Sequence, residues 1–262
     1  MNTQIYTSFQ IREVFHLEFL RWFSRKMTSA QYVLKGGVNL RLFFKSIRYS
    51  EDMDIDVSRV SVEKLKIVTL DILMSRGFSD SLRSFGIEKI VPPDIAKAKQ
   101  TDTTQRFKVH VFTTAGQDLF TKIEFSRRGL KGKLVVEPVD IQILRSYKMA
   151  PLLVPHYDTP SAVLQKIQAL AQRTVVQARD IFDLFLLNSQ LDLAEYKMAM
   201  SEPDILTIAM DNVFLVDFPQ FRDSVVAYLQ LEDQKTYASP MVWDEIKLKV
   251  SHFLEEIRDA AA

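Results

Sequence analysis

A glycine pair followed by an alternating acidic segment is the feature that most constrains how this chain can fold. Both lie in the stretch LKGGVNLRLFFKSIRYSEDMDID, residues 34–56. The apolar residues before the glycines predict a short strand over 32–34, and a helix is predicted over 38–45. The segment MDIDV alternates as a half-buried strand does, with Met53, Ile55 and Val57 on one face and the aspartates on the other. Carboxylates gathered in this way repel one another, so the fold must supply a positive partner.

The acidic strand predicts a magnesium site. Asp52, Asp54 and Asp56 point to the same side of a strand, at roughly 6.5 to 7 Å per two residues. Hard carboxylate oxygens suit Mg²⁺, which is typically held by one or two carboxylates, water and substrate phosphates. The ligand expected to complete the site is therefore a phosphate-bearing molecule.

The glycine turn predicts where that phosphate would bind. Gly36 and Gly37 open a helix, and exposed backbone N–H groups at a helix N-terminus form an anion site. Lys35 and Arg41 add positive charge beside the turn. A glycine pair before a helix is a weak signal alone, but its combination with the acidic strand is much more specific.

The remaining patterns predict an α+β chain in two parts. Helical spacing runs over 8–27 and 62–75, and RFKVHVFT and TKIEFSRR read as two strands joined by a turn. Strand patterns then disappear, and 161–190 reads as one long helix or two consecutive ones, with Thr159 as N-cap and Pro160 at the first helical position. We expect a catalytic core over 1–150 and a helical domain over 151–262 that contributes to the nucleotide site.

Composition excludes several classes of protein. The formal net charge is +1, so a nucleic-acid site must be a local basic patch. One candidate is the basic turn of Arg127, Arg128, Lys131 and Lys133, and the alternative is that this turn is only a solvated hairpin. The chain has no cysteine and its histidines are scattered, which argues against thiolate and zinc sites. With no run long enough to cross a bilayer, a cytoplasmic protein without membrane contact is expected.

The residues LKGG, the LR that follows and RYSEDMDID resemble the nucleotidyltransferase family of the AbiEii abortive-infection toxins and the related MenT toxins. The resemblance implies a polymerase β-like nucleotidyltransferase core with metal ligands at Asp52 and Asp54. Asp56 is a further acid on the same face, and Asp54 with Asp56 is the alternative metal pair. Glu124 matches the family's third carboxylate, which would orient or deprotonate the attacking hydroxyl. Its alternative role is an exposed strand residue paired with Lys122 or Arg127.

A second segment, KIQALAQRTVVQARDIFDL, is similar to the family's C-terminal signature. The matching positions are Lys166, Arg173, Arg179, Asp180 and Asp183. On one continuous helix all of them except Arg179 would share a face. The resemblance implies that Lys166 neutralises the triphosphate, that Asp180 positions Lys166 or contacts the nucleotide, and that Arg173 and Asp183 belong to the nucleotide site. The alternative is a set of helix salt bridges.

The predicted function is Mg²⁺-dependent transfer of a nucleoside monophosphate from an NTP to an acceptor hydroxyl, with a two-metal site. By resemblance, the acceptor is the 3′ end of a tRNA or another RNA, and a cognate antitoxin restrains the enzyme. The alternatives are a non-catalytic nucleotide- or RNA-binding module of the same fold and a transferase that acts on protein or a small molecule.

Overall fold

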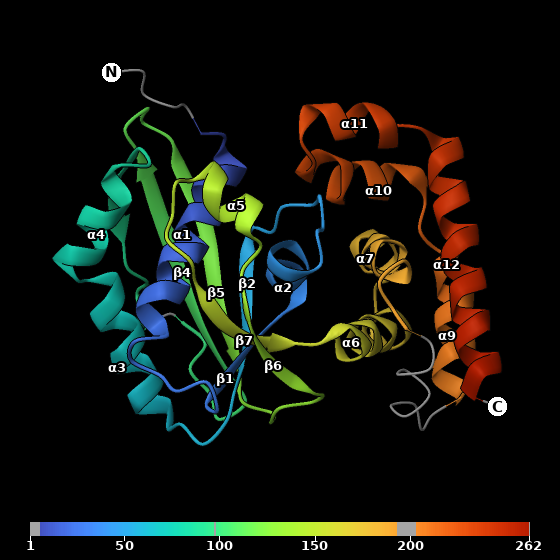
Figure 1. Ribbon diagram of the computed structural model, residues 1–262, viewed down its shortest axis with the longest axis horizontal. Helices are drawn as coiled ribbons and strands as arrows, with labels where there is room; N and C mark the ends of the chain where they lie inside the picture. The colour runs from blue at the N-terminus through green and yellow to red at the C-terminus, as the bar shows by residue number, and fades with distance from the viewer. Residues whose placement is uncertain (1–5, 97, 193–202, 262) are drawn as a thin grey trace. The chain divides into compact units, whose positions relative to one another are not determined.

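The computed structural model describes residues 6–96, 98–192 and 203–261 (Figure 1). The chain forms two compact units. The first contains Met1–Phe43 and Tyr49–Tyr157, and the second contains Phe44–Arg48 and Asp158–Ala262. The short segment 44–48 thus leaves the first unit and belongs to the helical one.

The first unit is built on a seven-stranded mixed sheet in the order β3-β4-β5-β2-β1-β7-β6. Parallel pairs join β2 to β5 and β1 to β7, and the other neighbours are antiparallel. The strands are β1 (Tyr32–Lys35), β2 (Asp52–Val57), β3 (Ile87–Val91), β4 (Thr104–Thr113), β5 (Asp118–Ser126), β6 (Leu134–Pro138) and β7 (Leu153–Tyr157). This sheet, with the helices around it and the helical unit, confirms the predicted α+β class.

Helices pack on the apolar side of this sheet (Figure 1). They are α1 (Ser8–Phe23), α2 (Gly36–Phe43), α3 (Val62–Leu73), α4 (Arg76–Arg83) and α5 (Ile141–Ser146). The α1 helix begins with a capping box between Thr7 and Gln10, and it ends at Phe23, earlier than the predicted Met27. Its side chains Phe15 and Phe19 join Met53, Ile55 and Phe125 of the sheet in one hydrophobic core. The predicted inward face of the acidic strand is therefore confirmed.

The second unit is entirely helical in its described part. Its helices are α6 (Thr159–Gln172), α7 (Ala178–Asn188), α9 (Pro203–Val213), α10 (Phe218–Ser224), a 3₁₀ turn (Val226–Tyr228), α11 (Leu231–Tyr237) and α12 (Pro240–Ala261). The predicted N-cap Thr159 is wrong by one residue, because the Asp158 side chain accepts the capping hydrogen bond from the Ser161 N–H. None of the helices in the described ranges has the length and apolar character that a membrane span requires.

Candidate active site

The predicted metal ligands, Glu124 and Lys35 lie on the outward face of the sheet. Residues opposite one another on neighbouring strands share a face, and the register aligns Lys35 with Asp54, Asp54 with Glu124, and Glu124 with Arg106. These four residues form a transverse row across β1, β2, β5 and β4. The row places two predicted catalytic carboxylates between two cations.

Ion pairs fix most carboxylates of this face. The Lys122 Nζ atom lies 2.8 Å from Asp52 Oδ2 and 3.9 Å from Glu124 Oε2. The Arg106 Nε atom donates to the same Glu124 oxygen at 2.6 Å. The predicted pairing of Glu124 with Lys122 is therefore present, but Arg127 instead donates to backbone carbonyls of Asp102 and Val60. Arg106 was not predicted, because only the β4–β5 register brings it to Glu124.

Asp54 is the exception. Within the described part of the chain its half-buried carboxylate accepts no hydrogen bond and forms no ion pair. Burial raises the pKa of Asp54, the nearby Glu124 and Asp52 raise it further, and Lys35 and Lys122 oppose them. These two lysines form their own ion pairs with Asp56 and Asp52 and not with Asp54.

The glycine turn closely approaches Asp54. Gly36 has a φ of +69°, and a Cβ at this position would lie 2.9 Å from Asp54 Oδ2. A side chain here would combine a strained left-handed backbone with a collision against the carboxylate. Gly36 therefore leaves the space on which the position of Asp54 depends, and α2 begins directly at this residue.

Asp56 is held differently from the other two aspartates. It is buried, its Oδ1 lies 2.5 Å from Lys35 Nζ, and its Oδ2 accepts a hydrogen bond from the Tyr157 hydroxyl at 2.7 Å. The Tyr157 hydroxyl in turn accepts from the Lys131 N–H at 2.9 Å. Lys35, predicted to bind phosphate, is thus paired with a carboxylate, and Tyr157 was missed because nothing local to its sequence links it to Asp56.

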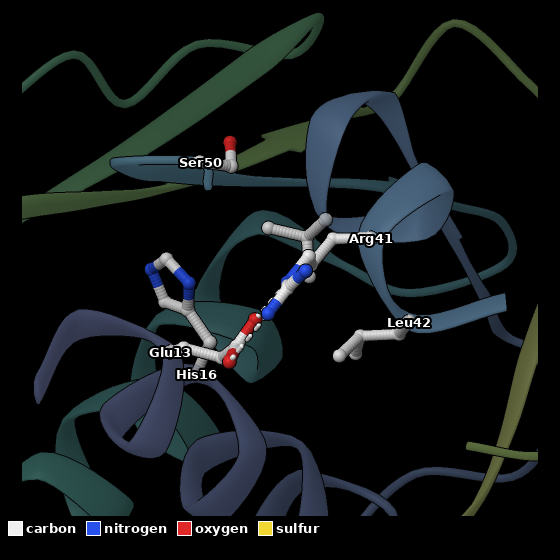
Figure 2. Close-up of a pocket in the computed structure, with 6 residues that line it drawn as sticks. Glu13, His16, Arg41, Leu42 and Ser50 are labelled. Carbon is white, nitrogen blue, oxygen red and sulfur yellow. Dashed lines mark hydrogen bonds and ion pairs between the residues drawn. The ribbon is translucent and has the colours of Figure 1, made fainter. Parts of the chain in front are cut away.

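Arg41 lies in a small pocket beneath the turn (Figure 2). Its Nε atom donates to Glu13 Oε1 at 2.6 Å, and its guanidinium stacks 4.3 Å from the centre of the Tyr49 ring. Glu13 also accepts from the Tyr147 hydroxyl at 2.6 Å. The structure places Arg41 in a buried polar network, and a contact with nucleotide remains a prediction.

A hydrogen-bond chain anchors the start of the acidic strand. The Thr121 hydroxyl donates its hydrogen to the Glu51 carbonyl at 2.6 Å. Because that hydrogen is used, the Thr121 hydroxyl oxygen accepts a hydrogen bond from His16 Nε2 at 2.9 Å. Burial, assisted by Arg12, lowers the pKa of His16 to about 3, which keeps the imidazole neutral. The chain from α1 through β5 to Glu51 holds the residue directly before Asp52.

The predicted residues of the second unit form their own buried cluster. Lys166 Nζ lies 3.0 Å from Asp180 Oδ1 and 2.6 Å from Asp183 Oδ2, and Arg173 Nε lies 2.9 Å from Asp180 Oδ2. Arg48 adds a fourth contact, 3.1 Å from the same oxygen of Asp183. Both aspartates are fully buried. Arg179 is exposed and outside the cluster, as predicted.

The physical basis of this cluster differs from the expected one. The helix is not continuous, because it stops at Gln172 and a new helix begins at Ala178. The chain turns between them, so α6 and α7 pack against each other. The pairing of Lys166 with both aspartates is thus made across a helical hairpin, and Arg48 was missed because it comes from the distant segment 44–48.

The carboxylates of the first unit fit a divalent cation in chemistry, although they do not form a finished cage. No group of three or more acidic, histidine or cysteine side chains in the described ranges is gathered as a ready metal site. Mg²⁺ needs only one or two protein carboxylates when phosphates and water complete its shell. Asp52 and the unpartnered Asp54 supply such a pair.

Comparison with known proteins places this geometry in context. Residues 18–237 match the family model described as nucleotidyl transferase AbiEii toxin, type IV toxin–antitoxin system. JHP933 from Helicobacter pylori is similar at 18% identity and a TM-score of 0.55, over 98% of this chain and 95% of that one. MenT4, a nucleotidyltransferase toxin from Mycobacterium tuberculosis H37Rv, is similar at 18% identity and a TM-score of 0.61, over 97% and 88%. No curated protein matches the chain.

Proposed function

Since this chain belongs to the AbiEii family of nucleotidyltransferase toxins of type IV toxin–antitoxin systems, we propose that it transfers a nucleoside monophosphate from an NTP to the 3′ hydroxyl of a tRNA. The resemblance predicted from LKGG and RYSEDMDID is confirmed, and so is the enzyme class. We further propose that Mg²⁺ is required, that the reaction takes place in the cytoplasm, and that a cognate antitoxin restrains it.

The unpartnered carboxylate of Asp54 carries this proposal. A half-buried ionised group without a partner destabilises a fold, and a bound cation would neutralise it. We assign Asp52 and Asp54 as the residues that would hold the metal, because Lys35 and Tyr157 already occupy both oxygens of Asp56. The bound metal would draw charge from the phosphates and the leaving group.

Glu124 is proposed to accept the proton of the acceptor hydroxyl. Its ion pairs with Arg106 and Lys122 both use Oε2, so Oε1 is left open in the described part of the chain. The hydroxyl oxygen forms a bond to the α-phosphorus, the bond from that phosphorus to the bridging oxygen breaks, and pyrophosphate leaves. The two cations orient the Glu124 carboxylate.

The Gly36–Gly37 turn is proposed to bind the phosphates. The turn offers backbone N–H groups at the start of α2, an arrangement that favours anions. In the helical unit, Lys166 is proposed as a further nucleotide-binding group: Asp180 and Asp183 fix its ammonium group, and the cluster has one more cation than carboxylates because Arg48 pairs with Asp183 as well. Arg173 adds charge to this cluster.

The test is incubation of the protein with Mg²⁺, each α-³²P-labelled NTP in turn and total RNA, followed by a denaturing gel. Asp54→Asn tests the site, and Asp71→Asn is the matched control because Asp71 is an exposed partner of Lys26. Label on RNA with wild type and Asp71→Asn, but not with Asp54→Asn, supports the proposal. Label on protein or a small molecule would replace the acceptor, and absence of label under every NTP would favour a non-catalytic binding module.

A further inference from the structure

The outward face of β4 and β5 carries a surface that extends beyond the proposed catalytic carboxylates. In β5 the side chains of Leu119, Thr121 and Ile123 are buried, which leaves Phe120 and Lys122 on the outward face with Glu124. In β4 the outward residues are Lys108, His110 and Phe112. The register aligns Lys108 with Lys122, His110 with Phe120, and Lys89 of β3 with Phe112.

Together these six residues form what we call the basic–aromatic strip: Lys89, Lys108, His110, Phe112, Phe120 and Lys122.

The rings of the strip form an open platform. Phe120 is 40% exposed, although large apolar side chains usually lie inside a fold. The His110 ring meets Phe120 edge-on at 5.5 Å and stacks with Phe112 at 6.4 Å. Lys108 Nζ lies 5.9 Å from the Phe120 ring centre. Aromatic faces flanked by lysines are what single-stranded nucleic acids bind, through base stacking and phosphate contacts.

The charge of the strip agrees with this reading. Lys122 is paired with Asp52 and Glu124, so the positive charge of the strip comes from Lys89 and Lys108. At the far end, the Asp118 carboxylate forms a hydrogen bond with His110 Nδ1 at 3.0 Å. The net charge of the whole chain is only +1, so this surface is a local basic region and not part of a general positive field. The basic turn of residues 127–133 was the other candidate for RNA contact, with a solvated hairpin as its alternative, and Arg127 in that turn donates to backbone carbonyls.

The strip is continuous with the proposed catalytic carboxylates. Phe120 lies four residues from Glu124 on the same strand and the same face, about 13 Å away at the usual rise of a strand. An extended chain that places its terminal hydroxyl at Glu124 would therefore pass its preceding bases over Phe120.

We propose that the basic–aromatic strip binds the single-stranded 3′ end of the acceptor RNA by stacking its bases on Phe120 and Phe112. This inference rests on the proposed function for the identity of the reacting end, and it adds where the acceptor binds and in which conformation. A paired end would present its backbone instead of base faces, so the strip selects unpaired nucleotides.

Binding is tested by fluorescence anisotropy with a labelled single-stranded RNA of about ten nucleotides and a hairpin RNA without an overhang. We expect the single strand to bind more tightly to wild type than the blunt hairpin. Phe120→Ala should weaken single-strand binding about five- to hundredfold through loss of one stacked base. Phe120→Trp should restore it, and Phe214→Ala, which removes a ring that is 51% exposed in the helical unit, should leave it unchanged.

NTP binding measured on the same variants separates this inference from the proposed function. Weaker RNA binding by Phe120→Ala with unchanged NTP binding supports the strip, even if wild type transfers no nucleotide. Equal RNA affinity of Phe120→Ala, Phe120→Trp and wild type would overturn it. Wild type that binds and transfers NTP but has no affinity for single-stranded RNA would also overturn it and point to a different acceptor.

An RNA with 4-thiouridine near its 3′ end provides a measurement that needs no variant. After irradiation, the crosslinked peptide should fall within residues 108–122. A crosslink confined to the turn of residues 127–133 would reject the strip in favour of that turn.

Discussion

Replacement of Gly36 by alanine tests whether the glycine turn exists to accommodate Asp54. The left-handed backbone of a non-glycine residue costs about 1–2 kcal/mol. The new Cβ, 2.9 Å from Asp54 Oδ2, must also displace the carboxylate, and an off-rotamer side chain adds about 0.5–1.5 kcal/mol. We therefore expect Gly36→Ala to lower the free energy of unfolding by about 1.5–3.5 kcal/mol.

The β4–β5 turn provides a matched control. Gly116 also has a positive φ, +78°, but a Cβ there would meet nothing within 4 Å. Gly116→Ala should therefore have the backbone penalty alone. In an Asp54→Ala background the excess penalty of Gly36→Ala over Gly116→Ala should vanish, because the atom that collides is gone.

Thermal unfolding and nucleotide transfer are measured on the same proteins. We expect Gly36→Ala to reduce transfer about a hundredfold, since a misplacement of about 1 Å can have that effect on a reaction. Gly116→Ala should retain Mg²⁺–NTP binding and the stabilisation that it brings. If Gly36→Ala matched Gly116→Ala in both stability and transfer, the reasoning that couples the turn to Asp54 would be refuted.

Three further predictions concern charged groups. Asp54→Asn should raise the melting temperature at neutral pH without ligand, because the raised pKa of Asp54 means that its ionised form destabilises the folded protein. This gain in melting temperature should disappear as the pH falls below about 3.8, and Mg²⁺ plus NTP should no longer stabilise the variant. The pKa of His16 is lowered from its usual 6.5 to about 3, so the folded protein should lose stability as the pH falls from 6.5 toward 3, by up to about 1.4 kcal/mol per pH unit. His16→Gln should flatten the plot of unfolding free energy against pH over this range. Lys166→Met should destabilise the helical unit by about 1–3 kcal/mol, because Asp180 and Asp183 each lose one charged partner and keep Arg173 and Arg48. Lys249→Met, which breaks an exposed pair with Glu245, should change stability by no more than about 0.5 kcal/mol in chemical denaturation.

Local patterns in the sequence were sufficient where the structure depends on neighbouring residues. The alternation of Met53, Ile55 and Val57 with aspartates predicted the strand and its buried face, because side-chain direction in a strand has a period of two. The glycine pair predicted the junction between strand and helix, although α2 spans Gly36–Phe43 and not the predicted 38–45. The short strands β3, β6 and β7 were not predicted, and β7 contains Pro155, which argues against a strand when only the sequence is known.

Partners from distant parts of the chain could not be predicted. Arg106 reaches Glu124 through the register of β4 and β5, Tyr157 reaches Asp56 from another strand, and Arg48 reaches Asp183 from segment 44–48. The grouping of Lys166 with Asp180 and Asp183 was predicted for the wrong reason, since the structure achieves it by a turn between two helices.

The transverse row of Lys35, Asp54, Glu124 and Arg106 has a consequence for how such a protein can vary. Each member lies on a different strand, so the alignment depends on register and not on the length of the connections between strands. A single-residue insertion within β4 or β5 would turn every following side chain to the opposite face and separate the row, whereas insertions in the loops would leave it intact. Loop insertions can therefore change the length of this chain without moving the four charged residues out of line.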